Sequence, residues 1–227
     1  MKILISDFDH TFFDENYLKN IELVNKFVSE GNMFIIATGR SINNLNIDII
    51  DHKIKYSYLI CSDGASIYDN KHNNIYTCNI DENLINPICD LLENDPNIAL
   101  TLIENDNFVS GTVANSIAGK FIDKAKCINL VEKINSLFPT INSYLSDNYI
   151  NIRNKKVSKY EGIKFLINNY NLDCEEIYTI GDSINDKEMC KNFKSFSFYN
   201  ADECVKNVSN TILKNFEEAI NLLMKNN

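Results

Sequence analysis

The chain has 227 residues, of which 44% are hydrophobic and 23% charged, as in an ordinary folded protein. Its formal net charge of −9 argues against a nucleic-acid partner, which would select for a basic face. There is no apolar run of bilayer-spanning length, no recognisable signal peptide and, among the seven cysteines, no Cys-x-x-Cys pair. These features favour a cytoplasmic protein with reduced thiols and no membrane partner.

The first part of the chain alternates between strand-like and helix-like patterns. A helix that ends near Gly31 separates the first two apolar runs, and a short helix is expected after Ser41. The apolar runs of strand length are residues 2–6, 33–37 and 58–61. This alternation predicts a parallel sheet covered by helices on both faces.

After Gly64 the pattern changes to that of an α+β module. A hairpin is expected first, followed by helices and strands in mixed order. The expected strands are residues 66–69, 75–78, 98–103, 107–109, 141–145 and 149–152, and the expected helices are residues 82–93 and 128–137. We therefore expect a second domain at residues 66–154, inserted into the first.

The α/β pattern resumes at Lys159. Apolar residues at helical spacing follow it, and two further strands and a last helix complete the frame. The expected strands are residues 177–180 and 195–198, and the last helix carries Phe216, Ala219, Ile220 and Leu223 on one face. The predicted fold class is α/β, a doubly wound parallel sheet built from residues 1–65 and 155–227.

Two acidic clusters follow two of these strands, Asp7-Phe8-Asp9 and Gly181-Asp182-Ser183-Ile184-Asn185-Asp186. In an open parallel sheet, ligands bind beyond the carboxyl ends of the strands where the strand order reverses, so we expect both clusters in one pocket. Two like charges about 4 Å apart repel by roughly 4 kcal/mol at an effective dielectric near 20, which a bound divalent cation would relieve. Ligands that are all oxygen favour Mg²⁺ over Zn²⁺. The expected metal ligands are Asp7, Asp9, Asp182 and Asp186.

Four segments together resemble the motifs of the haloacid dehalogenase-like phosphohydrolase superfamily, in the expected order. They are Asp7-Phe8-Asp9-His10-Thr11, Ile35-Ile36-Ala37-Thr38-Gly39-Arg40, Ser158-Lys159, and Gly181-Asp182-Ser183-Ile184-Asn185-Asp186. The second and fourth are similar to the forms found in the Cof-type sugar-phosphate phosphatase branch. The resemblance covers roughly residues 1–65 and 150–227 and implies a Rossmann-like core with an inserted α+β cap domain that selects the substrate.

The resemblance implies roles for five residues of the first three motifs. Asp7 would be the nucleophile that forms an aspartyl-phosphate, which divides one displacement into two. Asp9 would act first as general acid and then as base, and its backbone carbonyl would be a metal ligand. Thr38 and Gly39 would hold phosphate oxygens, and Lys159 would supply the positive charge on which phosphoryl transfer depends.

In the fourth motif, Asp182 is the expected side-chain metal ligand. Asn185 and Asp186 would orient it, or would bind phosphate and water attached to the metal. Among the neighbouring residues, Thr11 is expected to bond locally to the backbone, and Arg40 is equally compatible with a structural ion pair. The chain departs from the family pattern at two positions. His10 stands where glycine is commonest, and Asp63 stands where the Cof branch usually has asparagine.

The expected function is that of a Mg²⁺-dependent phosphatase which hydrolyses small soluble phosphomonoesters, such as a sugar phosphate or a phosphorylated small acid. The expected partner is thus a small phosphorylated molecule, and the chain is expected to be a monomer or a weak homodimer. Two alternatives stay open: a phosphomutase of the same superfamily, and a catalytically weak regulatory protein that binds a phosphometabolite. The intact Asp7, Asp9, Lys159 and Asp182 argue against the second alternative.

Overall fold

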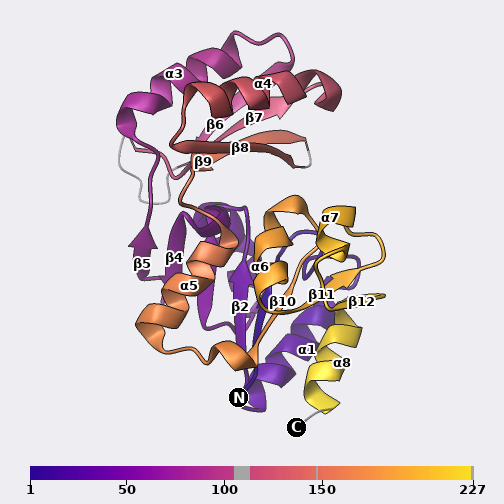
Figure 1. The fold of residues 1–227 in the computed structure, drawn as a ribbon. Helices are drawn as coiled ribbons and strands as arrows, with labels where there is room; N and C mark the ends of the chain where they lie inside the picture. The colour runs from indigo at the N-terminus through magenta and orange to yellow at the C-terminus, as the bar shows by residue number, and fades with distance from the viewer. Residues whose placement is uncertain (105–112, 147, 226–227) are drawn as a thin grey trace. The chain divides into compact units, whose positions relative to one another are not determined.

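The computed structural model describes residues 1–104, 113–146 and 148–225. The chain divides into two compact units (Figure 1). The core unit comprises Met1–Ile75 and Ser158–Asn227, and the inserted unit comprises Tyr76–Val157.

Among the described residues, the strands of the core unit form one sheet in the order β12-β11-β10-β1-β2-β3-β4-β5. All neighbours from β12 to β3 are parallel, and β4 is antiparallel to β3. The strands are β1 (Ile3–Ser6), β2 (Met33–Ala37), β3 (Tyr58–Cys61), β4 (Ser66–Asp69), β5 (Asn74–Thr77), β10 (Ile177–Ile180), β11 (Lys194–Phe198) and β12 (Thr211–Leu213). The expected α/β class with a parallel sheet is confirmed.

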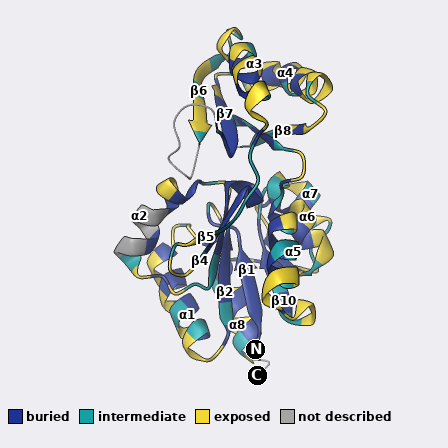
Figure 2. Cartoon of the chain, turned by 90° about the vertical axis from the view of Figure 1, so that its left-hand side faces the viewer, coloured by how far each residue is buried: buried dark blue, intermediate teal, exposed yellow. Residues whose placement is uncertain are grey.

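Helices cover both faces of this sheet, so its central strands β1 and β2 are buried along nearly their whole length. Figure 2 shows the buried strands with α1 and α2 on one side and α5 and α6 on the other. The helices of the core unit are α1 (Tyr17–Ser29), α2 (Ile42–His52), α5 (Lys159–Tyr170), α6 (Lys187–Asn192), α7 (Glu203–Lys206) and α8 (Phe216–Lys225). Short 3₁₀ turns lie at Ser62–Gly64, Cys174–Glu176 and Ile184–Asp186.

A cluster of aromatic side chains anchors the loop that follows β1. The ring of Phe12 lies 5.2 Å from that of Phe34 and 5.4 Å from that of Phe216, and 5.9 Å from that of Phe8. All four side chains are buried. Aromatic pairs at these distances stabilise a core beyond the area that they bury, so the loop carrying Asp9 is fixed at both of its ends.

The inserted unit has a separate antiparallel sheet in the order β6-β7-β9-β8 among its described strands. Helices α3 and α4 lie on one face of it (Figure 1) and enclose an apolar core. The elements are α3 (Glu82–Glu93), β6 (Ile98–Glu104), β7 (Ser116–Phe121), α4 (Lys124–Leu137), β8 (Ile141–Ser146) and β9 (Tyr149–Asn154).

Three features differ from the sequence-based expectation. The hairpin β4–β5 continues the core sheet, so the first boundary of the inserted unit lies at Tyr76, not at residue 66, and the second lies at Val157, not at residue 154. Strand β7 was not expected. Helix α4 begins earlier than residue 128 because the Asp123 side chain caps it by accepting from the Ala125 amide at 3.0 Å. The strand expected at residues 107–109 lies outside the described residues.

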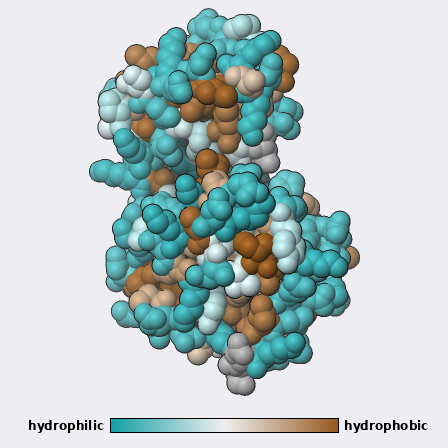
Figure 3. Space-filling view, turned by 45° about the vertical axis from the view of Figure 1, so that its right-hand side comes forward, coloured by the Kyte–Doolittle hydropathy of each residue, from teal (hydrophilic) through white to brown (hydrophobic). Residues whose placement is uncertain are grey.

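Within the described part of the chain, no helix is both long and apolar enough to cross a bilayer. The face shown in Figure 3 is mostly hydrophilic, with separate hydrophobic patches.

Candidate active site

The order of the strands in the sheet places the first and fourth motifs side by side. Strands β1 and β10 are parallel neighbours in which Ser6 pairs with Ile180, and the Asp7 amide donates to the Ile180 carbonyl at 2.9 Å. From β1 the chain proceeds to β2 and β3 on one side, and it returns through β10 to β11 on the other. The carboxyl ends of β1 and β10 therefore flank the switch point of the sheet, where ligands bind in folds of this type.

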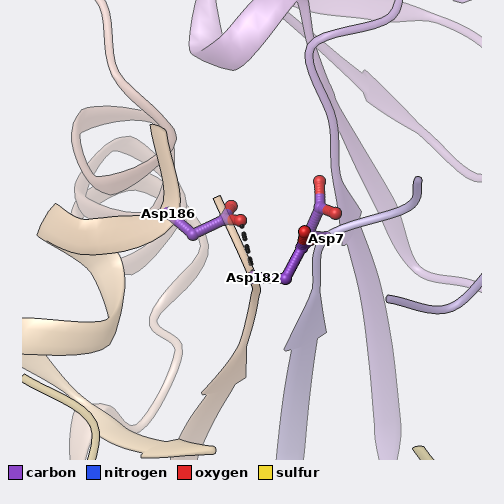
Figure 4. A group of neighbouring side chains, drawn as sticks. All are labelled: Asp7, Asp182 and Asp186. Carbon is purple, nitrogen blue, oxygen red and sulfur yellow. Dashed lines mark hydrogen bonds between the residues drawn. The ribbon is translucent and has the colours of Figure 1, made fainter. Parts of the chain in front are cut away.

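Three carboxylates converge at this switch point. Asp7, Asp182 and Asp186 each place one oxygen within 4.8 Å of the others (Figure 4). Asp7 is 6% exposed and Asp186 is fully buried. The Asp9 side chain, which was expected near them, is not part of this cluster.

Asp186 is held by the backbone of its own motif. Its Oδ2 accepts from the amides of Asp182 at 3.0 Å and Ser183 at 3.1 Å. Gly181 makes room for it, because a Cβ at that position would lie 2.4 Å from the Asp186 Cγ. These contacts explain why the motif starts with glycine and ends with aspartate: the Asp186 side chain holds the backbone of its own motif.

Asp182 is tied to the first motif through Thr11. The Thr11 Oγ1 donates to Asp182 Oδ1 at 2.9 Å, and the Ser183 Oγ donates to Oδ2 at 3.0 Å. The expectation that Thr11 bonds locally to the backbone is therefore wrong. Its buried hydroxyl instead fixes the orientation of a carboxylate in the loop after the neighbouring strand β10. The position of Thr11 shortly after the aspartates of the first motif is the sequence feature from which this role could have been inferred.

Lys159 supplies the positive charge of the site. Its Nζ donates to Asp7 Oδ1 at 2.5 Å and to Asp186 Oδ1 at 2.6 Å, and its side chain is fully buried. It opens α5, where the Ser158 Oγ caps the helix by accepting from the Glu161 amide at 3.2 Å. A cation at a helix N-terminus is disfavoured by the helix dipole, so the two carboxylates must offset both that effect and the burial.

The pKa values of these groups reflect strong coupling in a buried space. Burial raises the pKa of Asp7 well above its ordinary value; the Lys159 ammonium opposes this rise only in part, and Asp186 and Asp182 add to it. The pKa of Asp182 is also raised, first by burial and then by Asp186. Burial alone would lower the pKa of Lys159, but Asp186 and Asp7 raise it above the ordinary lysine value, so its charge persists. Three carboxyl groups thus share one ammonium, and two of them take up protons more readily than an exposed aspartate would.

Asp9 forms a bidentate ion pair with Arg40. The Arg40 Nε lies 2.8 Å from Asp9 Oδ2 and its Nη2 lies 2.5 Å from Oδ1. The guanidinium also lies over the rings of Phe8 and Phe13, at 4.9 and 5.3 Å. Of the two possibilities for Arg40, the structure shows the ion pair. His10, the next residue, has a φ of 59°, a left-handed conformation that explains why glycine suits this position.

The loop after β2 contains Thr38 and Gly39. Thr38 is buried, its amide donates to the Ile60 carbonyl at 2.8 Å, and its Oγ1 accepts from the Arg40 amide at 3.1 Å. A Cβ at Gly39 would lie 3.5 Å from the Asp63 carboxylate, which in turn accepts from Asn185 Nδ2 at 2.8 Å. Asp63 therefore links the second and fourth motifs.

The donors of the cluster suit a hard divalent cation. Asp7 and Asp182 offer carboxylate oxygens close together, no histidine or cysteine belongs to the described cluster, and one lysine faces three carboxylates. Oxygen ligands of this kind match Mg²⁺. Asp186 is fully buried and accepts from Lys159 and two backbone amides. Asp182 is only partly buried and accepts from the hydroxyls of Thr11 and Ser183, which can turn away. Asp7 and Asp182 are therefore the residues whose side chains would hold the ion.

A family model of haloacid dehalogenase-like hydrolases matches residues 4–113 and 102–220. The chain belongs to this family. A protein from Buchnera aphidicola subsp. Baizongia pistaciae (strain Bp), provisionally named a phosphatase, is 27% identical to it over 228 residues, which cover 82% of each chain.

Solved structures show the same fold at low sequence identity. A protein from Plasmodium vivax, provisionally described as an HAD/COF-like hydrolase, has a TM-score of 0.83 at 20% identity, with 99% of this chain and 94% of that chain covered. A phosphatase of the haloalkanoate superfamily from Bacteroides thetaiotaomicron has a TM-score of 0.80 at 18% identity, with 99% and 94% covered. The resemblance of the four motifs to this superfamily is confirmed, and as a haloacid dehalogenase-like hydrolase the protein is an enzyme.

Proposed function

We propose that this haloacid dehalogenase-like hydrolase is a Mg²⁺-dependent phosphatase that hydrolyses small phosphomonoesters through an aspartyl-phosphate on Asp7. The observation that carries the proposal is the placement of the Asp7 carboxylate. It lies at the switch point of the sheet, 2.5 Å from the Lys159 ammonium and within 4.8 Å of the Asp182 and Asp186 oxygens. The provisional phosphatase name of the Buchnera relative supports the same reaction class.

In the proposed reaction, one Asp7 oxygen attacks phosphorus. The bond from phosphorus to the leaving alcohol breaks, and Asp9 gives the leaving oxygen a proton. A water molecule then attacks phosphorus and gives a proton to Asp9, and Asp7 and inorganic phosphate are released. The ion pair with Arg40 holds Asp9 in place two residues after the nucleophile, and this pair must open at one Asp9 oxygen for that oxygen to carry the proton.

Lys159 has two functions in this scheme. It donates to Asp7 and Asp186 and partly offsets their charge. Since an ammonium has three hydrogens, one remains after these two bonds for a phosphoryl oxygen. A bound Mg²⁺ would supply the further positive charge that favours the ionised form of Asp7 and balances the charge of the phosphoryl group. The Thr38 hydroxyl, the Gly39 amide and the second Nδ2 hydrogen of Asn185 would complete the phosphate contacts.

The inserted unit would act as a cap that selects the substrate. The four motifs lie in the core unit, while the inserted unit has its own sheet and apolar core. The proposed substrates are sugar phosphates or phosphorylated small acids in the cytoplasm, with no nucleic-acid or membrane partner, acted on by a monomer or weak homodimer. Lids of this kind exclude water and retain the substrate during the reaction.

A panel of phosphomonoesters with a phosphate-release readout tests the proposal. The wild-type protein should hydrolyse at least one member with Mg²⁺ present and lose that activity in a chelator. Asp7→Asn should abolish turnover while the protein stays folded, because an amide cannot form the phospho-enzyme. Asp90→Asn makes the same change at an exposed position of the inserted unit and serves as the control. Substantial turnover by Asp7→Asn, or full activity without metal, would overturn the proposal.

A further inference from the structure

Asp63 is a buried carboxylate for which the proposed reaction gives no role. It is 1% exposed and lies in the turn after β3, between the loop of Thr38 and Gly39 and the fourth motif. One of its oxygens accepts from Asn185 Nδ2 at 2.8 Å. Buried carboxylates without a function are uncommon, because their desolvation is costly unless hydrogen bonds compensate for it.

The backbone at this turn is strained and held by its surroundings. Ser62, Asp63 and Gly64 have φ values of 46°, 51° and 102°, three left-handed residues in succession. The Asp63 amide donates to the Thr38 carbonyl and the Ser62 amide to the Arg40 carbonyl, both at 2.9 Å. A strained conformation persists only when neighbouring contacts impose it, and such conformations concentrate at functional sites. The turn therefore places the Asp63 side chain accurately.

The bond to Asp63 decides which way the Asn185 amide faces. An ionised carboxylate has only acceptors, so the amide nitrogen of Asn185 must be the atom that faces it. The Asn185 Oδ1 then lies on the other branch of the amide, where it is buried and has no hydrogen-bond partner among the described residues. A buried acceptor of this kind requires a donor. A phosphate dianion cannot provide one, whereas water bound to a divalent cation can.

We propose that Asp63 is a positioning residue: its carboxylate fixes the amide of Asn185 so that the amide oxygen accepts a hydrogen bond from water bound to the catalytic cation. The proposal rests on the metal-dependent function proposed above and adds Asp63 to the residues that tune metal binding. Asn185 lies next to Asp186 and three residues after Asp182 in the motif that frames the carboxylate cluster. Residues that orient the surroundings of a metal in this way affect its affinity strongly.

Mn²⁺ binding, measured by electron paramagnetic resonance of the free ion without substrate, tests this independently of catalysis. The variants are Asp63→Gly, Asn185→Ala and the double variant, with Asp90→Asn as the control that also removes one carboxylate charge, at an exposed site. Glycine removes the acceptor and adopts left-handed backbone readily, so Asp63→Gly keeps the turn, whereas the Oδ1 of an asparagine could still accept from Asn185. Each single variant should weaken Mn²⁺ binding by about 10-fold. In the Asn185→Ala background, Asp63→Gly should change the affinity by less than about 2-fold, because its effect acts through the amide.

Each other outcome overturns the proposal. An undiminished effect of Asp63→Gly in the Asn185→Ala background would show that Asp63 acts through its charge alone. Equal effects of Asp63→Gly and Asp90→Asn would show a non-specific charge effect. If Asp63→Gly did not fold, unchanged Mn²⁺ affinity in Asn185→Ala would be decisive against the proposal. If the variants give one of these results while the wild-type protein hydrolyses phosphomonoesters with Mg²⁺, only the role of Asp63 is refuted. If the wild-type protein binds no Mn²⁺, the proposed metal requirement is refuted as well.

Discussion

Replacing Lys159 by methionine removes the one ammonium of the described carboxylate cluster while keeping an apolar side chain of similar length. At N–O distances of 2.5 and 2.6 Å, each ion pair contributes a gross attraction of about 6 kcal/mol at an effective dielectric near 20. Most of this attraction offsets the desolvation of the three groups. Removing one partner leaves the others buried and uncompensated, which typically costs about 3–5 kcal/mol. We expect a loss of that size in the unfolding free energy of the metal-free protein at pH 7.

The loss should depend on pH and on metal. Because burial already raises the pKa of Asp7, and Lys159→Met removes the group that opposes this rise, the variant should take up a proton more readily and its stability deficit should shrink toward acid pH. Added Mg²⁺ should recover part of the deficit by mass action, since the ion replaces the missing positive charge.

Urea unfolding followed by circular dichroism, in chelator and in Mg²⁺, measures both effects. Lys191→Met removes an exposed lysine of α6 and is the matched control. A deficit below about 1 kcal/mol, the range of exposed ion pairs, would contradict the view that Lys159 compensates buried charge. A deficit that Mg²⁺ does not reduce would contradict the assignment of the cluster as a metal site.

Three further changes test other parts of the site. Gly64→Ala would place a Cβ 2.3 Å from the Ser158 carbonyl oxygen at a φ of 102°, so urea unfolding should show a loss of about 1–3 kcal/mol, and an unchanged midpoint would refute the close approach. Arg40→Gln should lower kcat more than it changes KM in steady-state assays. The loss in kcat should be smaller than the roughly 10²–10⁴-fold loss expected for Asp9→Asn, because Arg40→Gln frees the general acid without removing it. A change in KM alone would exclude this role of Arg40. Asp182→Asn should stabilise the metal-free protein, and this gain should grow as the pH rises from near 3.8 through the raised pKa of the Asp182 carboxyl. The variant should also lose the thermal stabilisation that Mg²⁺ gives the wild-type protein. A lower melting temperature than that of the wild type without metal would contradict the view that the Asp182 charge is repelled by its neighbours.

Much of the core could be predicted from the sequence because its central strands are mostly apolar and because β1, β2 and β10 directly precede motifs. The acidic clusters that follow residues 2–6 and 177–180 could be placed in one pocket in advance because ligands bind beyond the carboxyl ends of parallel strands where the strand order reverses. Strand β7 was missed because Gly119 and Lys120 interrupt its apolar pattern, and the sheet compensates by pairing it on both sides. The hairpin after Gly64 was assigned to the insertion because the sequence does not show which sheet a strand joins.

The functional site could likewise be predicted only in part. Motif order placed Asp7, Lys159 and Asp182 at the carboxyl ends of the strands, but it did not indicate that Asp9 pairs with Arg40 or that Thr11 bonds to Asp182. The latter bond joins residues 171 positions apart, and such contacts depend on the register of β1 against β10. The link from Asp63 to Asn185 likewise depends on a strained turn, which no local propensity predicts.

The measurement that tests the central claim most directly is the identification of the phosphorylated residue during turnover. The wild-type protein would be quenched in acid while it hydrolyses its best substrate, treated with borohydride to convert an acyl phosphate to homoserine, and digested with trypsin. The peptide of residues 3–19 contains Asp7, Asp9 and Asp14, so fragmentation in a mass spectrometer distinguishes them. We predict homoserine at position 7 in the wild-type protein and none in Asp7→Asn. Homoserine at another position, or none while turnover proceeds, would contradict the assignment of Asp7 as the nucleophile.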